Sequence, residues 1–219
     1  MAFELHLRRS RRARRLTLRV SSHDGRVTLT MPPRVSEAEA RAFAEDRRDW
    51  IETALERIQP IVSVGEGAAF PLEGHMVTPM PGAGARPRLE GDVLHLPAKA
   101  PGRAAKAYLR HLARDRLAEA ADRRSAELGA TYTRLDLRDT RSRWGSCSVA
   151  GRLMFSWRLV MAPPEVLDYV AAHEVAHLKR MDHSPAFWGL VEGLCPDWRD
   201  HRDWLRQEGG ALQAYRFED

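Results

Sequence analysis

Three histidines and one glutamate in the last quarter of the chain carry the clearest chemical signal in the sequence. His173, Glu174 and His177 form an H-E-x-x-H segment, and His183 follows it closely. On a helix, His173 and His177 lie one turn apart on the same face, so both imidazoles can bind one metal ion. Glu174 then projects beside the metal, where it can take a proton from a metal-bound water. This set predicts a hydrolase with one catalytic Zn²⁺ ion, because catalytic zinc uses three protein ligands and keeps one position open.

The third ligand must come from outside the H-E-x-x-H segment. His183 is the first candidate, because a sharp chain reversal after the helix would bring its ring to the metal from a second direction. Glu192 is the main alternative, and His201 is the next. A chance H-E-x-x-H is expected only about 0.03 times in a chain of this composition. The residues from Val170 to Leu178 are otherwise almost all apolar. A buried helix is therefore predicted, and buried His and Glu side chains are costly without a partner.

Several other side chains of the second half are candidates for substrate binding. Trp144 either lines a substrate groove or braces its own loop as a core aromatic residue. Arg141, Arg143, Tyr169 and His201 are candidates to stabilise a developing oxyanion. The arginines are also able to bind phosphate groups, since a guanidinium binds phosphate oxygens in a bidentate way.

The elements of the second half follow from periodicity and from breaking residues. We expect helices over residues 103–128, 165–181 and 197–209, a short helix from residue 184, and strands over 133–138 and 152–161. A polar loop over 141–148 separates the two strands. The predicted helix over 165–181 carries the H-E-x-x-H segment.

The first half reads as a small β-rich module. Apolar residues alternate in three segments near Leu5, Leu18 and Leu29, which predicts a three-stranded antiparallel meander. Its outer face would carry His6, Arg8, Arg15, Thr17, Arg19 and Arg26. Ser36 and Glu39 form a capping box, which predicts a helix to about Ile58. Its buried face would carry Phe43, Trp50, Ile51, Ala54 and Ile58. Two hairpins should follow, turning at Glu73-Gly74 and at Gly91-Asp92.

These elements predict an α+β protein of two parts. Residues 1–101 would form the β-meander, the capped helix and the hairpins, and residues 102–219 a metallohydrolase domain. No apolar run approaches the length of about 20 residues that spans a bilayer, so no membrane partner is expected. The N-terminus lacks the apolar segment of a secretory signal, which predicts a cytoplasmic protein. The two cysteines, Cys147 and Cys195, are expected to be reduced there.

The formal net charge is +5, and the excess lies at the N-terminus, where residues 1–34 hold nine arginines. Arginine is used throughout the chain, which has only three lysines, so one arginine-rich segment is weak evidence of function. The basic face is either a solvated sheet surface or a surface for phosphate-rich partners.

At its second half the sequence resembles the YgjP-like metallopeptidases, a family of predicted metal-dependent hydrolases related to the SprT-like and WLM zincin peptidases. The matching text is RDTRSRWGSCS at 138–148, FSWRLVMAPPEVLDYVAAHEVAHLKRMDHSPAFW at 155–188, and PDW at 196–198. The resemblance implies that residues 102–219 form a zincin-like metallohydrolase domain, that His173, His177 and His183 bind the metal, and that Glu174 is the base. The three histidines also fit the metzincin spacing, but Arg180 stands where that pattern has glycine, which argues against membership.

Three functions are consistent with these residues. The leading one is a metallopeptidase acting on a peptide or protein. A second is a metal-dependent nucleoside triphosphate pyrophosphohydrolase, with Arg141, Arg143 or the N-terminal arginines on the phosphates. A third is a DNA-associated protease recruited by the basic N-terminal sheet. The sequence does not indicate an oligomeric state.

Overall fold

The computed structural model describes residues 3–21, 25–56 and 60–218. The chain divides into two compact units, Met1–Pro60 and Ile61–Asp219. Each unit buries hydrophobic clusters of its own. The sequence favours placing the hairpins with the first part, up to residue 101. In the structure they lie in the second unit, because hairpin residues such as Leu94 share one core with Phe155.

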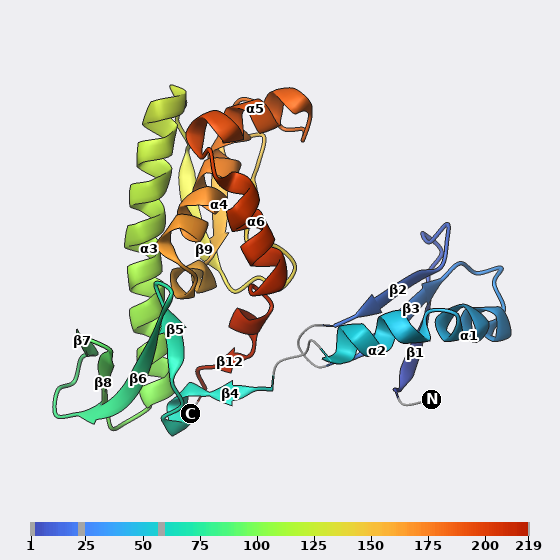
Figure 1. Cartoon of the computed structure of the whole chain (residues 1–219), viewed down its shortest axis with the longest axis horizontal. Coiled ribbons are helices and arrows are strands. Elements are labelled where there is room, and N and C mark those ends of the chain that lie inside the picture. The colour runs from blue at the N-terminus through green and yellow to red at the C-terminus, as the bar shows by residue number, and fades with distance from the viewer. Residues whose placement is uncertain (1–2, 22–24, 57–59, 219) are drawn as a thin grey trace. The chain divides into compact units, whose positions relative to one another are not determined.

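The first unit pairs a small sheet with two helices (Figure 1). Its elements are β1 (Leu5–Arg9), β2 (Thr17–Val20), β3 (Val27–Met31), α1 (Glu37–Glu45) and α2 (Arg48–Glu56). The strand order is β1-β3-β2, with β1 parallel to β3 and β2 antiparallel to it. The predicted antiparallel meander is therefore wrong. Alternation identifies which residues of a strand face the core, but it does not identify the partner strand.

The capping box at the start of α1 is confirmed. Ser36 Oγ accepts the Glu39 N–H at 3.2 Å, and Glu39 Oε2 accepts the Ser36 N–H at 2.8 Å. The single predicted helix is instead two, since α1 ends at Glu45 and α2 begins at Arg48. Of the predicted buried face, Ile51 is fully buried, Phe43 and Ala54 are half-buried and Trp50 is 51% exposed. Ile58 lies outside the described residues. The break between α1 and α2 rotates the apolar face of α2 away from the direction that a single continuous helix would give it. This rotation explains why Trp50 is exposed.

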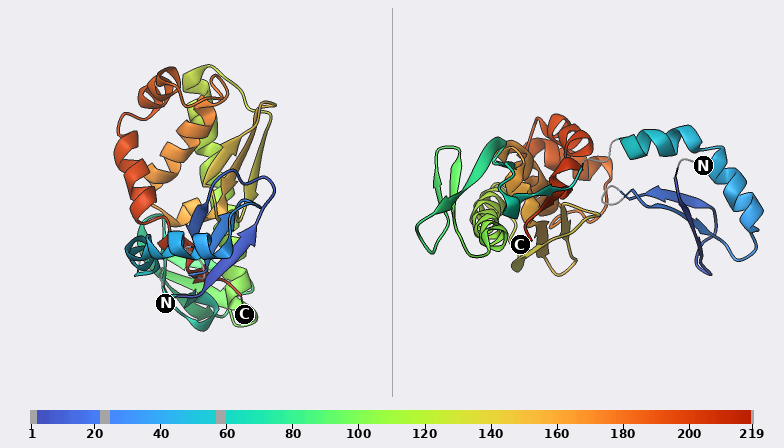
Figure 2. Two further views of the ribbon diagram at one scale, coloured as in Figure 1. Left: turned by 90° about the vertical axis from the view of Figure 1, so that its right-hand side faces the viewer. Right: turned by 90° about the horizontal axis from the view of Figure 1, so that it is seen from below.

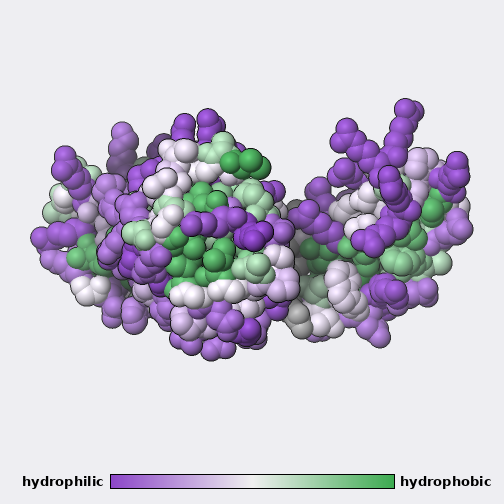
Figure 3. Space-filling view, turned by 90° about the horizontal axis from the view of Figure 1, so that it is seen from above, coloured by the Kyte–Doolittle hydropathy of each residue, from purple (hydrophilic) through white to green (hydrophobic). Residues whose placement is uncertain are grey.

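The outward face of the first sheet is polar, as predicted. Five of its six predicted residues are exposed, namely Arg8, Arg15, Thr17, Arg19 and Arg26, and His6 is half-buried. Figure 3 shows long hydrophilic side chains projecting from this unit.

The second unit begins with two hairpins that join into one sheet. Its first elements are β4 (Val62–Ser63), a 3-10 turn (Val64–Glu66), β5 (Phe70–Leu72), β6 (His75–Gly82), β7 (Arg88–Glu90) and β8 (Val93–Pro97). Both predicted turns are confirmed, because Leu72 pairs with His75 and Glu90 pairs with Val93. The sheet order is β5-β6-β8-β7, and β6 runs parallel to β8.

The remaining elements form the half that carries the histidines. They are α3 (Pro101–Leu128), β9 (Arg134–Arg138), β10 (Gly145–Cys147), β11 (Arg152–Ser156), a 3-10 helix (Trp157–Met161), α4 (Pro164–Ala176), α5 (Pro185–Leu194), α6 (Trp198–Gln207), a 3-10 turn (Ala211–Gln213) and β12 (Tyr215–Arg216). The long helix α3 ends at Gly129, whose φ of 63° is the left-handed cap that the sequence predicts. None of the described helices is long and apolar enough to cross a membrane.

Helix α4 lies at the centre of this half. It packs along α3, with the sheet β10-β11-β9 on one side and α5 and α6 on the other (Figures 1 and 2). Nine of its thirteen residues are buried. This burial explains why its sequence is apolar almost all round, and it fixes where the histidines at its end can point.

Two predicted bounds differ from the structure. The strand expected over 152–161 ends at Ser156, and the chain continues as a 3-10 helix. An apolar run alone does not distinguish a buried strand from a buried helical turn. Helix α4 ends at Ala176 rather than near Met181. Asp197 stands at the N-cap of α6, but its side chain makes no capping hydrogen bond.

Candidate metal centre and active site

The end of α4 places the first two histidines. His173 lies in the last turn of the helix, and His177 is the first residue after it, with φ −64° and ψ −19°. There the hydrogen bonding tightens, since the Leu178 N–H donates to Val175 O at 2.9 Å and the Lys179 N–H to Ala176 O at 3.1 Å. This i to i−3 pattern ends the helix and turns the chain back toward the site.

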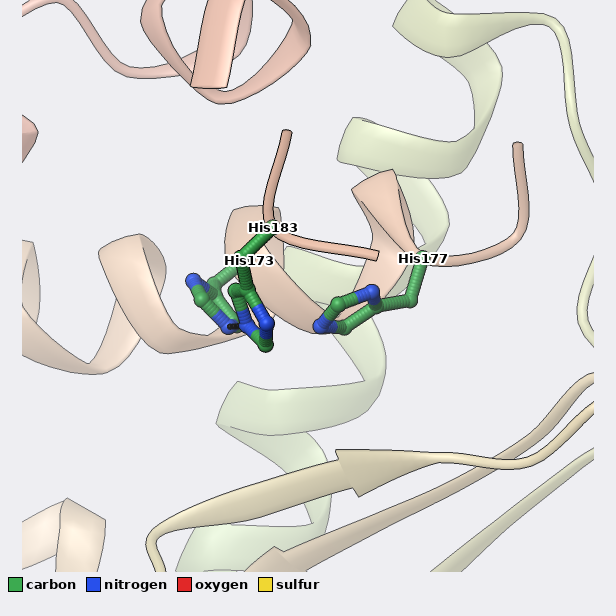
Figure 4. Close-up of side chains that lie close together, drawn as sticks. All are labelled: His173, His177 and His183. Atoms are coloured by element: carbon green, nitrogen blue, oxygen red, sulfur yellow. Dashed lines mark hydrogen bonds between the residues drawn. The ribbon is translucent and has the colours of Figure 1, made fainter. Parts of the chain in front are cut away.

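The three histidines that the sequence singled out converge. One ring nitrogen from each lies within 4.8 Å of the others. Figure 4 shows the rings of His173 and His183 meeting at their Nε2 atoms, with the His177 ring directed toward them. The two Nε2 atoms are 3.3 Å apart. Two nitrogens that share a tetrahedral zinc ion at about 2.05 Å each stand about 3.3 Å apart, so this pair has the spacing of metal ligands.

A second observation supports a metal at this point. His177 Nδ1–H donates to Arg180 O at 2.8 Å, which leaves Nε2 of His177 free to bind. Nδ1 of His173 is buried with no hydrogen-bond partner among the described residues, so its Nε2 is the nitrogen that faces the other rings. The donor set of three imidazoles with free Nε2 atoms fits one metal ion.

The environment favours the neutral form of His173 and His177, as metal binding requires. Burial, with the neighbouring His177, His183 and Arg202, lowers the pKa of His173 to about 3. Burial also lowers the pKa of His177, and the bond to Arg180 O opposes this only in part. The site can therefore bind a cation near neutral pH without first releasing protons from these two rings.

A buried aromatic residue supports all three rings. Phe187, in the first turn of α5, is fully buried and stacks on His177, with ring centroids 4.4 Å apart. The Phe187 ring also makes edge contacts with the other two histidines, with ring centroids 5.0 Å from His173 and 4.9 Å from His183. Ser184 caps α5 by accepting the Phe187 N–H at 3.4 Å. The start of α5 thus fixes both Phe187 and the segment that carries His183.

Glu174 lies beside the histidines and is only 6% exposed. Burial raises its pKa to about 8, and a backbone hydrogen bond from Cys147 and the charge of Arg143 oppose this. Gly145 of β10 touches the carboxylate so closely that an added Cβ would stand 2.6 Å from Glu174 Oε1. The absence of a side chain at Gly145 therefore makes room for the proposed base.

A cavity of about 430 Å³, here called the histidine cavity, opens onto these groups. Its lining residues are Ser142, Arg143, Gly145, Ser146, Cys147, His173, Glu174, His177, Met181 and His183. Strand β10 forms one wall and is an edge strand of its sheet. Two backbone hydrogen bonds, from Ser156 N–H to Trp144 O and from Ser148 N–H to Arg152 O, join this segment to β11. The backbone groups of Trp144 and Ser148 therefore point toward β11. By alternation, the backbone groups of Gly145 and Cys147 face the open edge.

A second cavity of about 270 Å³, here called the arginine cavity, adjoins the first. Its lining residues are Trp144, Gly145, Tyr169, Val170, His173, Glu174, Arg202, Leu205 and Arg206. Gly145, His173 and Glu174 belong to both cavities. The two hollows therefore lie on either side of the proposed base.

The sequence-predicted substrate residues divide between these cavities. Arg143 lines the histidine cavity, and Trp144 and Tyr169 line the arginine cavity. Trp144 also packs against the core, so both of its predicted roles are compatible with the structure. His201 lies behind Tyr169, with ring centroids 6.4 Å apart, and lines neither cavity. Arg141 is exposed and also lines neither.

The alternative third ligands are not in the cluster. Glu192 is exposed on α5 and pairs with Arg199 at 3.1 Å, and His201 stands beyond Tyr169. Sequence reasoning missed Arg202 and the contact between Gly145 and Glu174. Arg202 stands in a polar run with several other charged residues, and its local signal is Trp198, four residues earlier on the same helix.

Comparisons with known proteins found one family and one solved structure to which the chain is similar. The model of a family described as "YgjP-like, metallopeptidase domain" matches residues 14–208. Among solved structures, the chain is similar to one described as the crystal structure of the metallopeptidase zymogen of Pyrococcus abyssi abylysin, with 21% identity and a TM-score of 0.39. That match covers 42% of this chain and 95% of the other. No curated protein matches the chain.

Proposed function

Because the chain belongs to the YgjP-like metallopeptidase family and is therefore a metal-dependent hydrolase, we propose that it is a zinc peptidase with Glu174 as its general base. One observation carries the proposal. The free nitrogens of His173, His177 and His183 converge beside a buried carboxylate at the wall of an open cavity.

With a metal ion bound, the site would combine a Lewis acid with a base. His173, His177 and His183 would hold a Zn²⁺ ion, which would supply a more acidic bound water and a polarised carbonyl group. Glu174 accepts the proton of the attacking water and passes it to the leaving amine. In the metal-free protein, burial raises the pKa of Glu174 to about 8, and a bound cation would lower this pKa. The hydrogen bond to Arg180 O orients the His177 ring.

The edge of β10 favours an extended peptide as the substrate. Gly145 and Cys147 offer backbone groups on the edge that no described strand covers. A peptide that adds to this edge would form main-chain hydrogen bonds while its carbonyl groups pass Glu174. The Cys147 N–H already bonds to Glu174, so the remaining backbone groups are those available to a substrate.

The test is peptide hydrolysis by the zinc-loaded protein with Glu174→Gln as the comparison. We expect Glu174→Gln to keep its zinc and to lose turnover by about 10²- to 10⁴-fold. Glu165→Gln is the matched control, since Glu165 is exposed in the first turn of the same helix. Full activity of Glu174→Gln, with zinc bound, would show that this carboxylate is not the base.

A phosphoanhydride is the competing substrate class. Arg143 lines the histidine cavity and its charge acts on Glu174, so a phosphate group there would have a cationic partner. The same preparations should therefore be offered a panel of nucleoside triphosphates. Release of phosphate or pyrophosphate that depends on Glu174, without peptide cleavage, would favour this function over the first.

The exposed arginines of the first unit motivate a test of DNA recruitment. If this face binds DNA, affinity should fall steeply as salt rises, because bound arginines displace counterions from the phosphates. If DNA binding is absent, or does not change with salt, the hypothesis that this face recruits DNA is wrong.

A further inference from the structure

The arginine cavity has a composition that differs from the histidine cavity beside it. Aromatic and aliphatic side chains form its wall, among them Trp144, Tyr169 and Leu205. Two guanidinium groups, Arg202 and Arg206, enter it from successive turns of α6. The only carboxylate in its lining is Glu174, which already accepts the backbone N–H of Cys147.

Arg202 is held in place without a carboxylate. Its guanidinium lies over the rings of Trp188 and Trp198, at 5.0 Å and 5.7 Å from their centroids. The two indoles stack on each other with centroids 4.3 Å apart, so the support is rigid. Among the described residues, no carboxylate lies within ion-pair distance of Arg202. Its N–H donors are therefore free for a ligand that enters the cavity.

Arg206 is the second cationic group. Its Nη1 lies 3.1 Å from Asp203 Oδ1 in an exposed pair within α6. An exposed pair of this kind contributes little and can rearrange. The described lining thus presents more positive than negative charge in a hollow with partly apolar walls, where a carboxylate is attracted more strongly than in bulk water.

Resting on the proposed peptidase function, we propose that the arginine cavity recognises a carboxylate of the substrate peptide, with Arg202 as its main partner. The cavity shares Gly145, His173 and Glu174 with the histidine cavity. A peptide lying along β10 would therefore place a residue next to the cleaved bond in this hollow. The carboxylate belongs either to an acidic side chain or to the free C-terminus of the peptide.

Paired peptides distinguish these two sources. Zinc-loaded wild-type protein is given blocked peptides that carry Glu or Gln at each position around the cleaved bond. It is also given one sequence as the free acid and as the C-terminal amide. We expect kcat/KM to favour the carboxylate by at least about tenfold in one of these pairs, the scale of a charge-assisted hydrogen bond. Equal cleavage within every pair would overturn the proposal.

Variants assign the preference to Arg202. Arg202→Gln should reduce the preference to near unity, while Arg202→Lys should keep part of it because the charge remains. Arg199→Gln is the matched control, since Arg199 lies on the same helix, stacks over Trp198 at 4.5 Å and does not line the cavity. Zinc content and melting temperature establish that each variant is folded.

If Arg202→Gln does not fold, Arg206→Gln replaces it in the test and should weaken the preference for the carboxylate. A preference unchanged in every folded variant of Arg202 or Arg206 would overturn the assignment.

A binding measurement separates this inference from the proposed function. Fluorescence anisotropy of labelled Glu and Gln peptides, and of the acid and amide forms, is measured on zinc-loaded Glu174→Gln with and without Arg202→Gln. If no peptide is cut by the wild type but the carboxylate form binds at least about tenfold more tightly through Arg202, the peptidase proposal fails and the carboxylate site stands. If no peptide is cut and binding does not discriminate, both fail.

Discussion

At the scale of single residues, the site depends on nitrogens that are close together and unprotonated. His173 and His183 already stand at the spacing of ligands that share an ion, and His177 is oriented by a backbone carbonyl. Neutral rings at this spacing repel one another slightly through their lone pairs unless a cation or a proton lies between them. A metal ion bound at this point would satisfy all three groups together.

Removing one of these rings tests the ligand set. We expect His177→Ala to lose most of its bound zinc, because two imidazoles and water hold the ion far more weakly than three imidazoles. Metal analysis after dialysis against zinc-free buffer gives the stoichiometry. His111→Ala is the control, since the His111 side chain is 82% exposed on α3. A His177→Ala protein that kept one zinc ion per chain would exclude His177 as a ligand.

The buried base predicts a pH dependence of stability in the metal-free protein. The pKa of Glu174 is raised from 4.5 to about 8, so between these values the native state keeps a proton that the unfolded chain has released. This contribution to the free energy of unfolding is present below about pH 4.5 and is lost as pH rises toward 8. Glu174→Gln removes the titration, so its stability relative to wild type should grow across this window.

The gain should reach on the order of a few kcal/mol near pH 8 and be small near pH 5. Chemical denaturation of both proteins with a metal chelator measures it. The low pKa of His173 adds stability as pH rises from about 3 to 6.5, but it does so in both proteins and cancels in the difference. A difference that does not vary with pH would mean that Glu174 titrates normally in the fold.

At the scale of elements, β10 and α4 must approach closely for Glu174 to reach the cavity. Gly145 permits this approach, because the carboxylate occupies the space of a side chain there. We expect Gly145→Ala to move the carboxylate and to reduce kcat by about 100-fold while zinc stays bound, since small displacements of a catalytic group are costly. Steady-state kinetics together with metal analysis provide the measurement.

A second glycine controls for the added methyl group. A Cβ at Gly189 in α5 would meet no atom within 4 Å, so Gly189→Ala should leave both activity and zinc content unchanged. Wild-type kcat in Gly145→Ala would mean that Glu174 and β10 adjust to the methyl group without loss.

At the scale of the whole molecule, the two units have separate cores, and the metal ligands belong to one of them. Calorimetry should therefore resolve two unfolding transitions, of which zinc raises only one. A ligand at about 1,000 times its dissociation constant adds about 4 kcal/mol to the unit that binds it. The zinc-free protein is the reference. A single transition that moves as a whole with zinc would show that the units unfold together.

The sequence by itself determined the candidate site and most of the elements that carry it. His173, Glu174 and His177 follow from residue types at helical spacing, His183 from its place just after that helix, and both hairpin turns from glycine at positions that need positive φ. These features are local, so a short window of sequence contains the physical cause.

Only the tertiary structure decided what lies around the four residues. The parallel pairing of β1 with β3 and the contact of Gly145 with Glu174 depend on segments distant in the sequence. Arg202 lies over two indoles: Trp198 is one helical turn away on α6, but Trp188 belongs to α5 and is brought to Arg202 only by the fold. Pairing, burial and charge environment are sums over neighbours that the fold brings together, so the linear sequence does not display them.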